Sequence, residues 1–210
     1  MFFVFDGVDG AGKSTQLEMF VQWLREKDHD VVTCKDPGST ELGERIRSVL
    51  LGKHEIDISM RAEMMLFTTA RTQLIQQIVK PALAKKQTVV LDRYILSTVV
   101  YQGHAGQLDP EELWTINQIA TEGTMPDATF VLDVPVSVAR ERLGSTLDRV
   151  ESRGDEYFEK VRQGFINEAE RWPDRVDLID ATQTIDQIHS DICERALQYI
   201  NRKPQSGEAS

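Results

Sequence analysis

Residues 7–14 read Gly-Val-Asp-Gly-Ala-Gly-Lys-Ser and fit the pattern G-x-x-x-x-G-K-[ST] without a gap. Glycines at these positions let backbone N–H groups turn inward around a phosphate, and a following helix adds the positive end of its dipole. The motif follows the apolar run 1–6 and precedes residues 14–27, whose apolar side chains recur at helical spacing. A glycine turn before an ordinary helix is the alternative, but the order of strand, loop and helix favours a phosphate-binding loop.

Outward from this loop, short aliphatic runs alternate with longer stretches of helical periodicity. Strands are predicted at 1–6, 31–34, 88–92, 129–133 and 176–180, and helices at 14–27, 42–51, 61–84, 96–102, 110–122, 136–143 and 184–201. This alternation predicts one α/β domain, residues 1–202, with a five-stranded parallel sheet flanked by helices on both faces. A charged loop at about 140–156 is expected to be a mobile lid, and 203–210 a flexible tail.

Composition restricts the possible partners of the chain. Its 210 residues carry 24 Lys and Arg against 34 Asp and Glu, a net charge of −10, which argues against nucleic-acid and anionic-membrane partners. No apolar run approaches the ~18 residues that span a bilayer. The two cysteines, Cys34 and Cys193, are too few for a disulfide framework and are expected to be small buried residues. These features predict a cytoplasmic protein whose positive charge is concentrated at a site for a small anionic ligand.

Two pairs of residues next to predicted strands carry the phosphate chemistry. Lys13 can reach the β- and γ-phosphates of a nucleotide, and the hydroxyl of Ser14 can ligate Mg²⁺. After the third strand, Asp92 can hold Mg²⁺ through water or orient a phosphoryl acceptor, and Arg93 offers a fork for a phosphate. A strand-terminal salt bridge is the alternative for the second pair.

Two further sets of residues have both a functional and a purely structural interpretation. Phe67 and Arg71 lie four residues apart on a predicted helix, so an aromatic ring and a guanidinium share a face suited to a nucleobase, although a core aromatic is the commoner case. Arginines in and before the lid can neutralise charge that develops during phosphoryl transfer, although a solvated charged loop is the alternative. The arginines of this second set are Arg140, Arg142, Arg149 and Arg153.

In order along nearly the whole chain, these residues resemble the thymidylate kinase family. The matching stretches are FDGVDGAGKST (5–15), DPGSTELGERIRSVLL (36–51), AEMMLFTTARTQLIQQIVKPAL (62–83), LDRYILSTVVYQG (91–103), LDRVE (147–151) and IDAT (179–182). The phosphate-binding loop identifies only a superfamily, whereas block 91–103 together with Phe67 and Arg71 is typical of this member.

The resemblance implies a P-loop NTPase fold with strand order 2-3-1-4-5 and transfer of a phosphoryl group from MgATP to dTMP, giving dTDP for dTTP biosynthesis. It implies ATP contacts for Gly7, Val8, Asp9, Gly10, Ala11, Gly12, Lys13, Ser14 and Thr15. It implies dTMP contacts for Asp9, Pro37, Phe67, Arg71, Arg93, Thr98, Tyr101 and Gln102. Mg²⁺ is expected at Ser14, Asp92 and Asp9, catalytic roles at Lys13, Asp92 and a lid arginine, and a homodimer as the assembly.

Departures from the family pattern bear on the lid. Family members place an arginine either inside the phosphate-binding loop or on the lid, and Gly10 makes this chain resemble the lid-supplied type. Arg149 is the foremost candidate for the catalytic arginine, with Arg142 and Arg153 behind it, since residues 144–146 lack the arginine of many lids. In the second signature, Lys-Asp at 35–36 replaces the usual Arg-Glu, and Ser39 replaces a glycine.

Two other classes of protein are alternatives. A deoxynucleoside kinase, or another nucleoside monophosphate kinase on the same fold, would use a different acceptor, but a nucleoside kinase needs a carboxylate base where this chain has Asp-Arg-Tyr at 92–94. A nucleotide-binding regulatory switch would need segments that read the γ-phosphate rather than an acceptor site.

Overall fold

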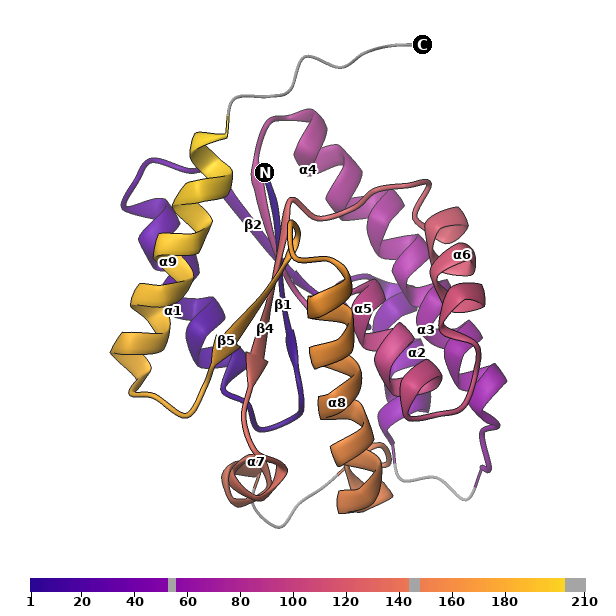
Figure 1. Cartoon of the computed structure of the whole chain (residues 1–210). Helices are drawn as coiled ribbons and strands as arrows, with labels where there is room; N and C mark the ends of the chain where they lie inside the picture. The colour runs from indigo at the N-terminus through magenta and orange to yellow at the C-terminus, as the bar shows by residue number, and fades with distance from the viewer. Residues whose placement is uncertain (53–55, 144–147, 203–210) are drawn as a thin grey trace.

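The structure is a computed structural model that describes residues 1–52, 56–143 and 148–202. Five parallel strands form one sheet in the order β2-β3-β1-β4-β5, as predicted (Figure 1). The strands are β1 (Phe2–Gly7), β2 (Val31–Lys35), β3 (Thr88–Asp92), β4 (Ala128–Asp133) and β5 (Val176–Asp180). In this order β1 occupies the centre, and the loop that follows it lies at the carboxyl edge where α/β sheets bind ligands.

Helices cover both faces of the sheet, with α1 and α9 on one face and α3, α5 and α8 on the other (Figure 1). Their bounds are α1 (Lys13–Arg25), α2 (Glu41–Leu51), α3 (Met60–Leu74), α4 (Lys80–Ala84), α5 (Ile95–Thr98), α6 (Pro110–Ala120), α7 (Val136–Leu143), α8 (Asp155–Arg171) and α9 (Ile185–Asn201). The sequence pattern predicts no helix with defined bounds where α8 lies.

The central strand is buried on both faces, which explains its continuous apolar sequence. Phe3 and Phe5 contact Phe20 of α1, with ring centroids 5.3 and 5.4 Å apart. On the other face, Phe2 packs edge-on against Tyr94 at 5.3 Å. These contacts fix the loop after β1 between the two helical layers.

Two predicted helices are interrupted by π-helical turns. The segment 61–84 consists of α3, the π-helical turn η1 (Ile75–Val79) and α4. Pro81 lacks an N–H and would clash with the carbonyl four residues earlier, so the wider turn accommodates it. The segment predicted at 96–102 begins as α5 and continues as the π-helical turn η2 (Val99–His104). Turns of this kind are frequent at functional sites.

The predicted lid begins in α7 and continues through Asp148 to the 3₁₀ turn η3 (Glu151–Arg153). Residues 144–147 of the lid and the predicted tail 203–210 lie outside the described residues, so the predicted mobility stays a prediction. The Asp148 carboxylate accepts hydrogen bonds from the backbone N–H groups of Val150 and Glu151, both at 2.8 Å. Short-range hydrogen bonds therefore shape the part of the lid around Asp148. None of the helices in the described ranges could cross a membrane.

Candidate active site

The phosphate-binding loop opens onto a cavity of about 470 Å³ at the carboxyl edge of the sheet. Its lining includes Lys13, Ser14, Asp92 and Arg142. Gly10 has a φ of +84°, and a Cβ there would lie 2.2 Å from the carbonyl oxygen of Ala139. The loop therefore packs directly on the backbone of α7 and leaves no room for a side chain at position 10.

Lys13 is folded back into the loop. Its Nζ donates hydrogen bonds to the carbonyl oxygens of Val8 at 2.8 Å and Gly7 at 3.1 Å. Burial, together with the positive charge of Arg93, lowers the pKa of Lys13 to about 8. A phosphate in this cavity would give the ammonium group an anionic partner in place of carbonyl groups.

A cluster of ion pairs and hydrogen bonds surrounds Asp9. Its carboxylate accepts a hydrogen bond from Nη2 of Arg93 and another from the hydroxyl of Tyr101, the latter at 2.9 Å. The Arg93 guanidinium also donates to the oxygens of Gly7 and Ser97, both at 3.0 Å. Burial acts to raise the pKa of Asp9, but the charges of Arg93 and Lys13 outweigh it and hold that pKa below its ordinary value.

A second cavity, of about 130 Å³, adjoins the first. All eight residues predicted to contact the acceptor line it, namely Asp9, Pro37, Phe67, Arg71, Arg93, Thr98, Tyr101 and Gln102. Asp9 and Arg93 also line the phosphate cavity, so the two cavities meet at this ion pair. The structure thus brings together side chains from segments that are far apart in the sequence.

Arg71 is buried and fixed from several directions. Its Nε donates to Asp36 at 2.5 Å, its Nη1 donates to the side chain of Asn117, and its Nη2 donates to the Tyr94 carbonyl and Thr98 hydroxyl, both at 3.0 Å. Only 1 % of Arg71 is exposed. A guanidinium held in this way presents its remaining donor capacity in one direction, which suits recognition of a carbonyl group.

The family profile described as Thymidylate kinase matches residues 5–192. The chain belongs to the thymidylate kinase family. Enzymes of this family are transferases that phosphorylate dTMP to dTDP with ATP as the donor.

Known thymidylate kinases are similar over most of this chain. One from Rhodopirellula baltica is 40 % identical over 183 residues, covering 87 % of this chain and 74 % of the relative. Another from Fervidobacterium nodosum is 40 % identical over 201 residues, covering 95 % and 100 %. The crystal structure of the thymidylate kinase from Ehrlichia chaffeensis has a TM-score of 0.75 and 29 % identity, covering 93 % of this chain and 98 % of that one.

The lid arginines of this thymidylate kinase lie in two different places. Arg142 lines the phosphate cavity, where its Nη2 donates to the carbonyl oxygen of Ala181 at 3.3 Å. Arg149 and Arg153 both pair with the buried carboxylate of Glu63 on α3, the second at 2.5 Å. The catalytic role expected of Arg149 stays a prediction, and in this arrangement its guanidinium is engaged beside the acceptor cavity.

Sequence reasoning missed three polar residues of this thymidylate kinase site. Glu63 is fully buried and also accepts a hydrogen bond from Nε2 of Gln102 at 2.8 Å. Asp36 and Asn117 hold Arg71, as described above. A signal for Glu63 was present, because Glu63, Phe67 and Arg71 follow one another at four-residue intervals and share one helical face. No local pattern points to Asn117, which comes from α6.

The departures at 35–39 are accommodated locally. Ser39 adopts a φ of +63°, the conformation that favours glycine, and its hydroxyl accepts a hydrogen bond from the Lys35 backbone N–H at 2.8 Å. Lys35 pairs with Glu44 at 3.1 Å on the surface. Asp36, in the position of the usual glutamate, supports Arg71. Each of the three residues therefore has a local partner in this structure.

Proposed function

We propose that this thymidylate kinase transfers the γ-phosphoryl group of MgATP directly to the 5′-phosphate of dTMP by in-line displacement. The observation that carries the proposal is the meeting of the two cavities at Asp9 and Arg93. A donor phosphate in one cavity and an acceptor phosphate in the other would both approach the Arg93 guanidinium. Catalysis then depends on positioning and charge neutralisation, with no covalent enzyme intermediate.

On the donor side, residues 7–15 cradle the ATP phosphates, and Lys13 stabilises charge on the transferring group. Mg²⁺ fits this cavity because Asp92 has a buried carboxylate oxygen, Oδ1, without a hydrogen-bond partner among the described residues, and Ser14 lines the same cavity. When bound, the ion neutralises charge on the phosphates. Ser14 would hold it directly, Asp92 through water, and Asp9 from the acceptor side, although both Asp9 oxygens already have partners.

On the acceptor side, Arg93 holds the 5′-phosphate of dTMP and Phe67 stacks on the thymine ring. Arg71 donates to the carbonyl edge of the base, and Thr98 and Gln102 contact the base beside it. Tyr101 crowds the 2′ position and disfavours ribonucleotides. Support comes from the common cavity that these side chains line and from the fixed orientation of Arg71.

The lid divides its arginines between the two substrates. Arg142 neutralises charge on the donor phosphates, because it is the lid arginine that lines their cavity. Arg149 and Arg153 hold the lid over dTMP through Glu63, whose third partner, Gln102, is a base-contacting residue. Acceptor binding and lid closure are thereby connected.

A panel of acceptors with excess MgATP tests the function. We expect kcat/KM to be highest for dTMP and lower for dUMP by a modest factor, since one methyl group contributes about 1–3 kcal/mol. Rejection of dCMP should be stronger, because its amino group would face the donors of Arg71. Preference for a purine or ribonucleotide acceptor contradicts the dTMP assignment. Phosphorylation of thymidine itself would indicate a nucleoside kinase, and slow ATP hydrolysis unaffected by any acceptor would indicate a switch.

A cytoplasmic homodimer is a further part of the proposal. Leu42 and Val49 on α2 and Met65 on α3 are large apolar side chains that are between 39 % and 48 % exposed. Because α2 and α3 pack against each other, these residues offer helices for an apolar contact with a second copy. Both cysteines are free thiols, which suits a reducing compartment. Sedimentation of the wild type against Leu42→Asp tests the dimer, which the substitution should dissociate.

A further inference from the structure

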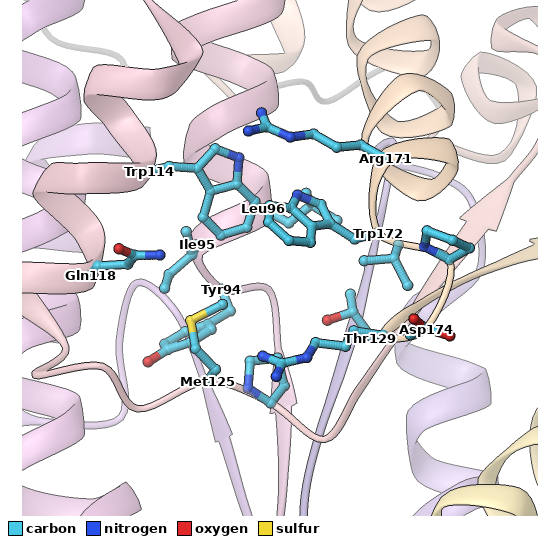
Figure 2. A pocket seen from close by; sticks show the side chains of 14 residues that line it. Tyr94, Ile95, Leu96, Trp114, Gln118, Met125, Thr129, Arg171, Trp172 and Asp174 are labelled. Atoms are coloured by element: carbon cyan, nitrogen blue, oxygen red, sulfur yellow. The ribbon is translucent and has the colours of Figure 1, made fainter. Parts of the chain in front are cut away.

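A third cavity, of about 510 Å³, is lined by residues of α5, of α6 and of the end of α8, and lies outside the proposed substrate site (Figure 2). Thr129, the second residue of β4, and Val176, the first residue of β5, form part of its wall, so it reaches toward the amino ends of these strands. Neither residue lines the cavities assigned to ATP and dTMP. Its volume lies within the roughly 300–1,000 Å³ of cavities that bind small molecules.

The wall of this cavity is largely apolar and aromatic. Ile95 and Leu96 are buried residues of this wall, and Met125 also lines the cavity. Trp114 and Trp172 approach each other with ring centroids 5.9 Å apart and an interplanar angle of 64°. Figure 2 shows both indoles on the same side of the cavity as Leu96, with Met125 and Tyr94 opposite them. Flat apolar surfaces of this kind fit a planar ring system.

The cavity is lined by two arginines, which differ in their contacts with the described residues. Arg171 is held by Glu111 through two contacts at 2.5 and 2.9 Å, whereas the Arg175 side chain makes no hydrogen bond or ion pair with any residue that the structure describes. Asp174, the neighbouring acid, lies at the side of the cavity away from Trp114 in Figure 2. Charge complementarity therefore favours an anionic group at Arg175.

Tyr94 connects this cavity to the site for dTMP. Its ring forms part of the cavity wall, and its hydroxyl donates to the carbonyl oxygen of Thr124 at 2.8 Å. Its backbone carbonyl accepts a hydrogen bond from Arg71 at 3.0 Å, and its ring lies 5.5 Å from the Arg71 guanidinium carbon. Its chain neighbour is Arg93, which has a φ of +65°. A ligand that moves Tyr94 would shift both arginines assigned to dTMP.

We propose that this cavity binds a planar aromatic molecule that carries one anionic group, and that its occupancy changes the KM for dTMP. The aromatic part lies against Trp114, Trp172 and the buried side chain of Leu96, and the anionic group pairs with Arg175. The effect on KM rests on the proposed function, whereas the binding itself does not.

Binding is tested with 8-anilinonaphthalene-1-sulfonate as the anionic probe and N-phenyl-1-naphthylamine as its uncharged counterpart. Saturating dTMP and ADP occupy the substrate cavities during the titration. Two of the three tryptophans line this cavity, so a bound probe should quench most of the tryptophan emission, and the quenched fraction should rise in Trp23→Phe. Arg175→Gln should weaken binding of the sulfonate about tenfold and leave the uncharged probe unchanged. Arg25→Gln, at another exposed arginine, should change neither.

Kinetics complete the test. At a saturating concentration of the sulfonate, the KM for dTMP should shift in the wild type and in Arg25→Gln, and at the same concentration it should shift less in Arg175→Gln. Absence of saturable binding, or equal loss in both arginine variants, overturns the site. Saturable binding at Arg175 with an unchanged KM overturns the coupling to dTMP. In each of these outcomes the dTMP kinase activity without probe is normal, which separates them from failure of the proposed function.

Discussion

The donor half and the acceptor half of this site are built in opposite ways. The donor half is centred on one contiguous stretch, since residues of the phosphate-binding loop between Asp9 and Thr15 line its cavity, and Asp92, Arg93 and Arg142 are among the residues that other segments add. The acceptor half is assembled from side chains of α3, η2, α6, the lid and the loop after β2. In the acceptor half, buried polar side chains hold one another in a network, so the loss of one partner affects the others.

This difference implies that the two halves affect different kinetic constants. Groups on the donor side act on charge that develops as the phosphoryl group moves, so their loss should appear mainly in kcat. Groups on the acceptor side hold a preformed pocket for the base, so their loss should appear mainly in KM and in the choice of acceptor. Substitutions on the two sides of the site should therefore separate in their effects on kcat and on KM.

The largest effect is expected from Arg142→Ala. Arginines that stabilise a transferring phosphoryl group contribute about 10³–10⁵ in kcat, and Arg142 is the lid arginine at the phosphate cavity. Arg149→Ala should instead raise the KM for dTMP and lower kcat by less. Steady-state kinetics with both substrates varied measure this. A crippled kcat in Arg149→Ala beside a normal Arg142→Ala would return the catalytic role to Arg149.

Lys13→Ala should lower kcat by about 10²-fold or more while the protein still folds, because the ammonium group stabilises the transferring phosphate. Lys27→Ala is the matched control, since this surface lysine lies over Trp23 at 5.1 Å and away from the site. Rates and circular dichroism of both variants check the result. If Lys13→Ala keeps more than about a tenth of the wild-type kcat, the donor assignment is wrong.

Glu63→Gln addresses the acceptor side. The amide keeps an acceptor for Gln102 but removes the charge that Arg149 and Arg153 share, so we expect the KM for dTMP to rise about tenfold with a smaller change in kcat. Glu44→Gln removes an exposed partner of Lys35 instead and should change little. A variant in which kcat falls and KM is unchanged would place Glu63 with the donor half.

Tyr101→Phe should have the smallest effect. It removes one hydrogen bond to Asp9, worth about 0.5–1.5 kcal/mol, so the KM for dTMP should rise by a factor of about 2–10. Tyr101→Ala should go further and admit UMP, since it also removes the ring. Tyr199→Phe loses a similar 2.8 Å bond to Asp177 far from the site and serves as the control. Equal rejection of UMP by all three variants would contradict the role assigned to Tyr101.

The same contrast explains how far the sequence could predict the molecule. Strand and helix periodicity predicts the elements of the sheet, and the spacing around Lys13 predicts the phosphate-binding loop, because both patterns are local. Family resemblance, rather than any local pattern, brought Tyr101 and Gln102 into the acceptor site, and periodicity alone predicted an ordinary helix where the structure has η2. The partnership of Arg71 with Asn117 joins residues 46 positions apart. Such contacts depend on packing between elements, which local pattern does not encode.

The close approach of Gly10 to Ala139 also limits how this enzyme can change over generations. A glycine codon of the GGN type becomes an arginine codon by one base change, so an arginine inside the loop is within easy reach of mutation. Yet the new Cβ would lie 2.2 Å from the Ala139 carbonyl oxygen. An enzyme with arginine at position 10 would therefore be impaired until further substitutions had shifted α7. Because α7 leads into the lid, loop and lid must be inherited as a matched pair, and exchanging only one of them between distant relatives should yield inactive hybrids.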